Sequence, residues 1–326
     1  MLKPFSLSLI FSFRNEADNL PELIRRCRSV LASLISQNTL SSYEFIFVND
    51  ASTDHSLSIL TSCAAEKNDI KIITMSRSFG VSPCVMAGLE YSLGDWVIYM
   101  DADLQDPPEI IPGLLQKILE DPSLDVVHTI RTSRDGEPAF KLFITKIGYT
   151  ILNKFSSVPI PVEAGDFKLL SRRMVNHLVK FKETRPFTRG LVSWIGFKQG
   201  FIPYKRKARF AGESHFKIFN PKVINNFFGS ALISFSSAPL KLAIFFGLLA
   251  MLIDLVVMGH ALFEKFSGHA VPGWTAMMIV MLFFSGVQLF SLGMIGLYLH
   301  GIYEQTKNRP NYIIESTHGF SETEKI

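Results

Sequence analysis

Two carboxylates, Asp101 and Asp103, follow an apolar run that ends at Met100. If that run is a strand, side chains two residues apart point to the same side, so both carboxylates face one site. Paired carboxylates bind a hard divalent cation such as Mg²⁺ or Mn²⁺ and leave its other coordination positions to phosphate oxygens. The spacing therefore predicts a metal site that also takes a phosphorylated ligand.

Two arginines, Arg131 and Arg134, follow a later apolar run at residues 125–130. The planar guanidinium fork matches the oxygens of a phosphate group, which makes both side chains candidates for a second phosphate site. The alternative is that both are solvated side chains on a loop.

Apolar, β-rich runs alternate with helical patterns over the first 130 residues. This alternation predicts a mostly parallel α/β sheet, whose ligands bind at the carboxyl ends of the strands. Asp50, Asp101 and Asp103 all lie at such ends. Neither a dinucleotide fingerprint nor a P-loop motif occurs, so those two site types are excluded. The predicted strands are residues 7–13, 43–49, 70–75, 96–100 and 125–130, and the predicted helices include residues 19–35 and 82–93.

The charge of the 326-residue chain is uneven along its length. It is −8 over residues 1–126, +13 over residues 127–236 and −1 over the remainder, which together give the net charge of +4. A hydrophobic share of 48% with 19% charged residues excludes a disordered chain. The three cysteines form no CxxC pair, which argues against a disulfide framework or a zinc site and suits a reducing compartment.

Two long apolar segments, residues 242–263 and 274–299, are each long enough to cross a bilayer. The short linker between them predicts a transmembrane hairpin within residues 239–302, the alternative being two buried core helices. More lysine and arginine residues flank the hairpin than lie in its linker, which places both flanks in the cytoplasm. For Asp254, within the first segment, we favour a helix or subunit contact over a proton pathway.

The remaining divisions follow from this anchor. Residues 1–215 are predicted to form a cytoplasmic catalytic domain, residues 216–238 an interfacial amphipathic helix, and residues 303–326 a cytoplasmic tail. Residues 139–155 show a second amphipathic pattern, for which packing on the sheet is an equal alternative. A basic region beside a bilayer faces lipid phosphate more simply than it faces nucleic acid, so we expect no nucleic-acid partner.

The chain resembles the family 2 glycosyltransferases, and within them the polyprenyl-phosphate (bactoprenol) glucosyltransferase type, which is related to dolichyl-phosphate mannose synthase. The resemblance covers nearly the whole chain. It rests on seven ordered motifs at residues 13–16, 48–54, 76–80, 100–109, 165–172, 189–196 and 210–214. It implies a glycosyltransferase A-type nucleotide-diphospho-sugar fold. The sequence departs from the family pattern at Ser12, Val81 and His215, and the last two departures remove cations near the substrates.

The resemblance also implies roles for individual residues. The donor nucleotide would be bound by Glu16, Asn49, Asp50 and Asp101. By the same likeness Asp101 and Asp103 would hold Mg²⁺ or Mn²⁺ on the donor diphosphate, which stabilises the negative charge of the departing nucleotide.

On the acceptor side, the resemblance implies that Arg131 and Arg134 bind the lipid phosphate. Asp166 stands where inverting relatives place a catalytic base. A phosphomonoester with a second pKa near 6 is already largely ionised at neutral pH, so deprotonation is hardly needed. We therefore expect Asp166 to position the acceptor or the sugar. The candidate catalytic side chains are Asp166, Asp103 and Arg131.

These expectations combine into one reaction, the transfer of glucose from UDP-glucose to polyprenyl (undecaprenyl) phosphate with inversion, at the cytoplasmic face of the inner membrane. UDP-N-acetylglucosamine, a modified arabinose nucleotide and GDP-mannose remain open as donors. A lipid flippase or carrier is the alternative from another class, and it would need ionisable residues in several spans. The two-helix anchor invites self-association into a homo-oligomer.

Overall fold

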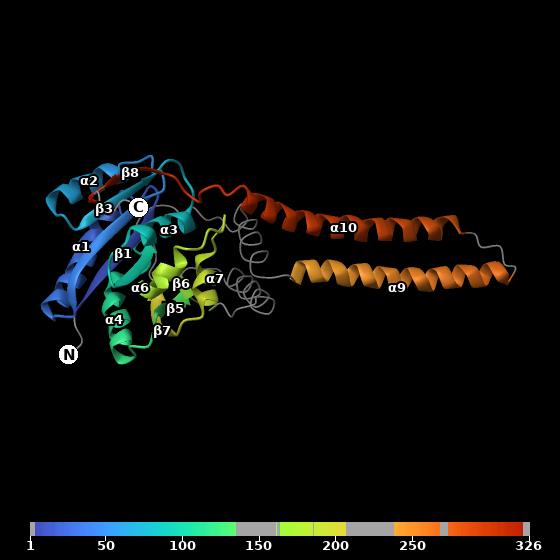
Figure 1. Ribbon diagram of the computed structural model, residues 1–326, viewed down its shortest axis with the longest axis horizontal. Coiled ribbons are helices and arrows are strands. Elements are labelled where there is room, and N and C mark those ends of the chain that lie inside the picture. The colour runs from blue at the N-terminus through green and yellow to red at the C-terminus, as the bar shows by residue number, and fades with distance from the viewer. Residues whose placement is uncertain are drawn as a thin grey trace.

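The structure is a computed structural model that describes residues 4–134, 161, 164–184, 186–206, 238–267 and 273–321. Its described part contains an eight-stranded sheet with the strand order β7-β5-β6-β4-β1-β2-β3-β8 (Figure 1). The strands are β1 (Phe5–Phe13), β2 (Leu40–Asn49), β3 (Ile70–Met75), β4 (Trp96–Asp101), β5 (Val126–Arg134), β6 (Ala164–Ser171), β7 (Gln199–Arg206) and β8 (Ile314–His318).

The sheet is mixed and mostly parallel. Strands β4, β1, β2 and β3 run parallel, as do β5 and β7, whereas β6 is antiparallel to β4 and β5, and β8 is antiparallel to β3. The five strands predicted from apolar runs are confirmed as β1 to β5. They read as nearly continuous apolar runs because both faces of a parallel sheet are covered.

Helices cover both faces of the sheet. One core cluster joins α1 (Leu20–Ser36), α2 (Ser56–Glu66) and α4 (Ile111–Glu120) to one face, around Phe11, Phe45 and Phe47. The other joins α3 (Val81–Tyr91), α6 (Arg172–Leu178) and α7 (Thr188–Ile195) to the opposite face, around Ile10, Val48 and Val97. The 3₁₀ helix η1 (Pro108–Ile110) leads into α4. Prolines stand in the first turn of α1, η1 and α4, where no backbone hydrogen bond is lost.

Two long helices, α9 (Ala238–Phe266) and α10 (Trp274–Thr306), lie side by side and project away from the α/β domain (Figure 1). Of the helices that the structure describes, only α10 contains a segment long and apolar enough to cross a membrane, at Phe283–Thr306. The expected first span, residues 242–263, lies within α9, whose apolar stretch is the shorter Ala243–Val257. A hairpin of two spans therefore stays a prediction.

Several predicted features lie outside the described residues. These are the amphipathic segment at residues 139–155, the segment at residues 216–238 except Ala238, which begins α9, and the motif at residues 210–214. The side chain of Asp254 also lies outside the description, although its backbone belongs to α9. The two amphipathic segments and the role of Asp254 therefore stay predictions.

The segment after α10 returns to the sheet. Strand β8 pairs antiparallel with β3, and the backbone N–H of Ser76 donates to the carbonyl of Ile313 at 3.0 Å. At the end of α10, the Gln305 side chain accepts from the backbone N–H of Thr184 and donates to the carbonyl of Lys182. The residues predicted as a tail therefore include an edge strand of the α/β domain.

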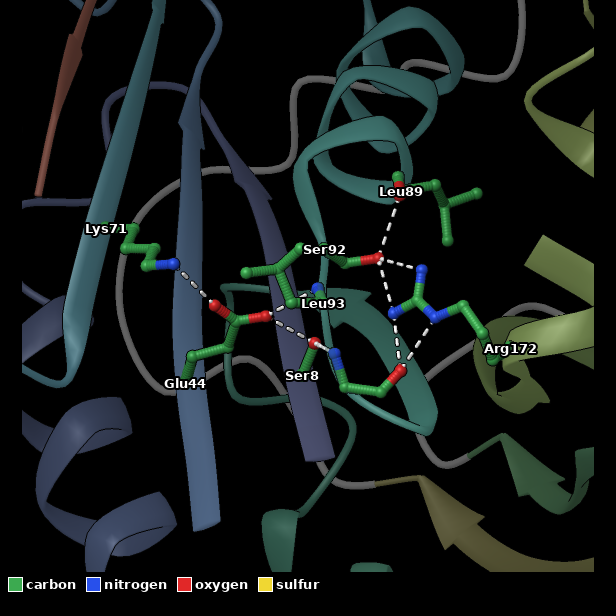
Figure 2. Close-up of polar contacts among 8 residues, drawn as sticks. Ser8, Glu44, Lys71, Leu89, Ser92, Leu93 and Arg172 are labelled. Atoms are coloured by element: carbon green, nitrogen blue, oxygen red, sulfur yellow. Dashed lines mark hydrogen bonds and ion pairs between the residues drawn. The ribbon is translucent and has the colours of Figure 1, made fainter. Parts of the chain in front are cut away.

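A polar network joins the amino ends of the central strands (Figure 2). The Glu44 carboxylate on β2 accepts from the Ser8 hydroxyl on β1, from the backbone N–H of Leu93 and, at 2.9 Å, from the Lys71 ammonium on β3. The Ser8 hydroxyl in turn accepts from the backbone N–H of Gly94 at 2.8 Å. One carboxylate thus joins three strands to the turn before β4.

Arg172, at the start of α6, binds the turn before β4 from the side opposite Glu44 (Figure 2). Its guanidinium donates to the Gly94 carbonyl and to the Ser92 hydroxyl, and that hydroxyl donates to the Leu89 carbonyl at the end of α3. A Cβ at Gly94 would lie only 2.6 Å from the backbone nitrogen of Ser8. The turn therefore fits against β1 only because residue 94 has no side chain.

We expect Gly94→Ala to lower the free energy of unfolding by about 1–3 kcal/mol, because the new methyl group meets backbone atoms of a central strand that cannot move aside. Denaturant unfolding of the detergent-solubilised protein measures this. The matched control is Gly113→Ala in α4, where the nearest atom to the new Cβ would be 3.9 Å away. The control should leave stability unchanged or raise it slightly. Equal effects of the two substitutions would contradict the packing argument.

Candidate active site

The carboxyl ends of β1, β2 and β4 meet at one edge of the sheet, and hydrogen bonds join the loops that follow the first two. Asn15 takes a left-handed backbone conformation with φ of 57° and exchanges hydrogen bonds with Thr53, while its backbone N–H donates to the Ser52 hydroxyl. The Asp54 carboxylate accepts from the backbone N–H groups of Ala17 and Ser56. The loops at residues 14–19 and 50–55 are therefore joined, and we call this edge of the sheet, with its loops, the rim.

The predicted donor residues Glu16, Asn49 and Asp50 are all buried at this rim. The Asn49 amide oxygen accepts from the backbone N–H of Ser52 at 2.9 Å. The Glu16 carboxylate accepts from the side-chain amide of Asn19. The structure thus brings the three predicted residues to one place and shows that two of them shape the loops themselves.

Asp50 holds the loop between β3 and α3. Its carboxylate accepts from the Ser78 hydroxyl at 2.8 Å, from the backbone N–H of Phe79 at 2.6 Å and from the backbone N–H of Gly80 at 3.1 Å. Gly80 has a φ of +94°, a conformation that favours glycine. Asp50 therefore anchors a second wall of the rim, a role that the sequence pattern did not predict.

Asp101 ends β4 and Asp103 follows it, and both are partly buried at the rim. Asp103 accepts from the backbone N–H of Gln105 at 3.1 Å across a turn in which Leu104 has a φ of 59°. Among the residues that the structure describes, no group of three or more His, Cys, Asp or Glu side chains is arranged to hold a metal ion. Two carboxylates fit a cation whose remaining ligands are waters and substrate phosphates.

Asp166 on β6 forms a bidentate ion pair with Arg189 on α7, with Nε–Oδ1 and Nη2–Oδ2 distances of 2.9 and 2.5 Å. Burial by itself would raise the pKa of Asp166. The Arg189 guanidinium more than offsets this and holds the pKa well below its usual range, with Lys168 and Arg131 acting in the same direction. A carboxylate fixed in this way is a weak base.

Lys168, two residues along β6, is completely buried. Its ammonium has no hydrogen-bond partner among the described residues and lies 5.4 Å from the centre of the Tyr99 ring. Burial lowers the pKa of Lys168 to about 7, Arg189 adds to the effect and Asp166 opposes it. The neighbouring His128 has a pKa lowered to about 3, by burial and by the charge on Lys168.

Arg131 on β5 is also mostly buried, with 13% of its side chain exposed. Its Nε donates to the Tyr204 hydroxyl at 3.1 Å, and its Nη2 lies 3.7 Å from the carboxylate of Asp106. Arg134 ends β5, where its backbone is paired with Arg206, and its side chain lies outside the described residues. Arg131 is thus a fixed cation near Asp166, and the role predicted for Arg134 stays a prediction.

The sequence patterns missed several residues of the site. The sequence signal for Lys168 is its place as a single cation within the otherwise apolar run Phe167–Leu170, a run that a surface strand would not need. The sequence signal for Asp106 is its place in the same motif as Asp101. The pairing of Arg189 with Asp166 and of Tyr204 with Arg131 depends on chain segments that the sheet brings together, and no local pattern indicates it.

Residues 8–179 match the family described as Glycosyl transferase family 2. Curated relatives match over almost the full length, at identities above 30%. The chain belongs to glycosyl transferase family 2. As a member of that family it is a glycosyltransferase with an A-type α/β fold, which confirms the predicted family and the α/β part of the predicted fold class.

Among the relatives of this family 2 glycosyltransferase, the "Uncharacterized glycosyltransferase YkcC" of Bacillus subtilis is 36% identical, over 98% of this chain and 96% of that protein. The "SfII prophage-derived bactoprenol glucosyl transferase" of Shigella flexneri is 32% identical, over 96% and 98%. The "Prophage bactoprenol glucosyl transferase homolog" of Escherichia coli is 31% identical, over 95% and 98%. Each match extends through α9 and α10, beyond the family match at residues 8–179.

Asp50→Asn tests the anchoring of the loop between β3 and α3. In the variant one carboxylate oxygen becomes an NH₂ group, which cannot accept from the N–H donors it faces. We expect the amide hydrogens of Phe79 and Gly80 to exchange with solvent about tenfold faster or more, since charge-assisted hydrogen bonds are lost.

Hydrogen–deuterium exchange measures this effect. Asp54→Asn is the matched control, because Asp54 accepts from Ala17 and Ser56 in the neighbouring loop. It should speed exchange near residue 17 and leave residues 79 and 80 protected. Unchanged protection of the loop in Asp50→Asn would show that Asp50 does not hold it.

Lys168→Met tests the buried ammonium. Because the folded-state pKa of Lys168, about 7, lies below the ordinary value of 10.5, the unfolded chain binds more protons between these pH values. The wild-type free energy of unfolding should therefore rise with pH relative to Lys168→Met, by at most about 1.4 kcal/mol per pH unit. Denaturant unfolding at pH 7 to 10 measures the difference. Lys198→Met, at a lysine that is more than half exposed, is the control, and parallel curves for wild type and Lys168→Met would contradict the prediction.

Proposed function

We propose that this glycosyltransferase transfers a sugar from a nucleotide sugar to polyprenyl phosphate at the membrane surface. The observation that carries the proposal is the attachment of a family 2 fold to a helix long and apolar enough to cross a membrane, because α10 leads into β8 of the same sheet. The names of relatives similar over the whole chain, bactoprenol glucosyl transferases, support a polyprenyl acceptor.

The pairing of β8 with β3 also supports two membrane crossings. It puts the segment after α10 on the same side of the membrane as the rest of the sheet. If α10 crosses once, the chain must cross once more between β7 and α10, and α9 is the long helix that the structure describes in that interval. We therefore propose that α9 and α10 form a multi-pass hairpin in the inner membrane, with the α/β domain in the cytoplasm.

On the donor side, we assign the nucleotide to the rim formed by Glu16, Asn49 and Asp50. Asp101 and Asp103 would hold Mg²⁺ or Mn²⁺, which when bound offsets the charge that develops on the leaving diphosphate. Asp50 acts by fixing the loop at residues 78–80 rather than by offering a free carboxylate. Bound donor would lie across the carboxyl ends of β1, β2 and β4.

On the acceptor side, we assign the lipid phosphate to Arg131 and Arg134. The phosphate oxygen attacks the anomeric carbon in line with the departing nucleotide, so the configuration at that carbon inverts. A phosphate acceptor needs no strong base. That requirement agrees with Asp166, whose ion pair with Arg189 keeps it ionised and fixed in place, suited to positioning the sugar or the acceptor.

The donor we propose is UDP-glucose, in keeping with the glucosyl transferases among the relatives. The test is to incubate the purified protein with undecaprenyl phosphate and a panel of labelled UDP-glucose, UDP-N-acetylglucosamine, a modified arabinose nucleotide and GDP-mannose, and to identify the lipid product by mass spectrometry. A glucosyl lipid formed only with a divalent cation is the expected result. No lipid product with any donor would overturn the proposal.

In the same assay, Asp101→Ala should lower turnover on the order of 10²-fold or more, because a ligand of the charge-stabilising cation is lost. Asp121→Ala, at the opposite edge of the sheet and paired with Lys198, is the control and should retain activity. Intact, cation-dependent transfer by Asp101→Ala would refute the metal assignment while leaving the proposed reaction standing.

A further inference from the structure

The guanidinium of Arg131 lies beside three residues, Tyr204, Asp106 and Gly165. Arg131 is paired with Tyr204 across the parallel strands β5 and β7, and the register shifts just after it, between Arg131 and Ser133. On this face of the sheet the Tyr204 ring packs edge-on against Phe167, with ring centres 6.3 Å apart. The ring therefore keeps its place through packing that does not depend on its hydroxyl.

The Tyr204 hydroxyl links two charges. It accepts from Nε of Arg131 at 3.1 Å and donates to the carboxylate of Asp106, which is completely buried. Burial and the neighbouring Asp106 raise the pKa of Tyr204 to about 12, so the hydroxyl stays protonated and can do both at neutral pH. The same Asp106 lies 3.7 Å from Nη2 of Arg131. A buried carboxylate and a hydroxyl thus fix one edge of the guanidinium.

Gly165 also lies against the guanidinium. A Cβ at this position would lie 2.8 Å from Nη2 of Arg131 and 3.2 Å from its Cζ. Because Gly165 directly precedes Asp166, any displacement of the guanidinium there also affects the strand that carries the Asp166–Arg189 pair. The guanidinium lies against bare backbone, and its plane is set by the surrounding protein before any ligand arrives.

We propose that Tyr204 and Asp106 are positioning residues that aim the Arg131 guanidinium at the acceptor phosphate, with Gly165 providing the space. This inference rests on the proposed function, since it takes Arg131 as a ligand of the lipid phosphate. A guanidinium binds a phosphate through parallel N–H bonds only when its plane is correctly oriented. Holding that plane in advance lowers the entropy that binding must give up.

Tyr204→Phe tests this inference, because it removes one hydroxyl and keeps the ring against Phe167. Arg131 keeps its charge but loses the acceptor of its Nε. We expect KM for undecaprenyl phosphate to rise about tenfold, the effect of about one charge-assisted hydrogen bond, with KM for the nucleotide sugar unchanged. The matched control is Tyr43→Phe, which removes a hydroxyl bonded to Asp69 outside the site and should change neither KM.

Gly165→Ala would crowd the same guanidinium with a methyl group, and it too should raise KM for the lipid phosphate more than KM for the donor. In a double-mutant cycle, Tyr204→Phe should have little further effect once Arg131 is replaced by Lys, whose ammonium offers no Nε. Additive effects in the cycle, or equal rises of both KM values in Tyr204→Phe, would overturn the inference.

Failure of the proposed function can be distinguished from failure of the positioning role. If the wild-type protein forms no sugar-linked lipid, the acceptor assignment itself is wrong. If the wild type forms it and Tyr204→Phe binds the lipid phosphate normally, only the positioning role is wrong. Should Tyr204→Phe fold poorly, as judged by its thermal unfolding against Tyr43→Phe, the Gly165→Ala variant and its cycle with Arg131→Lys decide between the outcomes.

Discussion

The pairing of β1 with its two neighbours is the constraint on which the site depends. Phe13 at the end of β1 is in register with Asn49 of β2, and Ser12 with Asp101 of β4. The backbone N–H of Asp50 then donates to the Phe13 carbonyl at 3.0 Å. Since side chains alternate along a strand, a slip of one residue in either pairing would turn these polar groups into the apolar core. Burial of β1 on both faces prevents such a slip, because its apolar side chains fit both core clusters.

How much could be predicted from the sequence follows from the same physics. Strands β1 to β5 are evident because burial on both faces demands apolar runs, and Asp50, Asp101 and Asp103 are found because such runs stop at them. Strand β8 was not predicted, since an edge strand has one open side and tolerates a polar sequence such as Ile314–His318. The partners of Arg131 and Asp166 were not predictable either, because Tyr204 and Arg189 reach them only after distant segments pair.

Most of the buried charge at the site is compensated before any substrate binds. Asp166 is paired with Arg189, and Arg131 with Asp106 through Tyr204. A buried or partly buried pair contributes little net stability, but loss of one member leaves an uncompensated charge, so these geometries persist. Lys168 is the exception, since its ammonium has only the face of the Tyr99 ring and no hydrogen bond among the described residues. Burial without a hydrogen bond lowers the pKa of Lys168. When Lys168 is charged, it helps to keep Asp166 ionised.

The connection between α10 and the candidate site is short. Gln305 in the last turn of α10 binds the backbone of Lys182 and Thr184, in the loop that leads into α7, and α7 carries Arg189. From the other end of the same segment, the backbone pairing of Ser76 with Ile313 reaches the loop that Asp50 anchors. The segment that ends α10 and follows it therefore contacts both the loop before α7 and the loop between β3 and α3. In the proposed reaction, which joins a water-soluble donor to a lipid, these contacts within a single chain would fix the distance between the site and the bilayer.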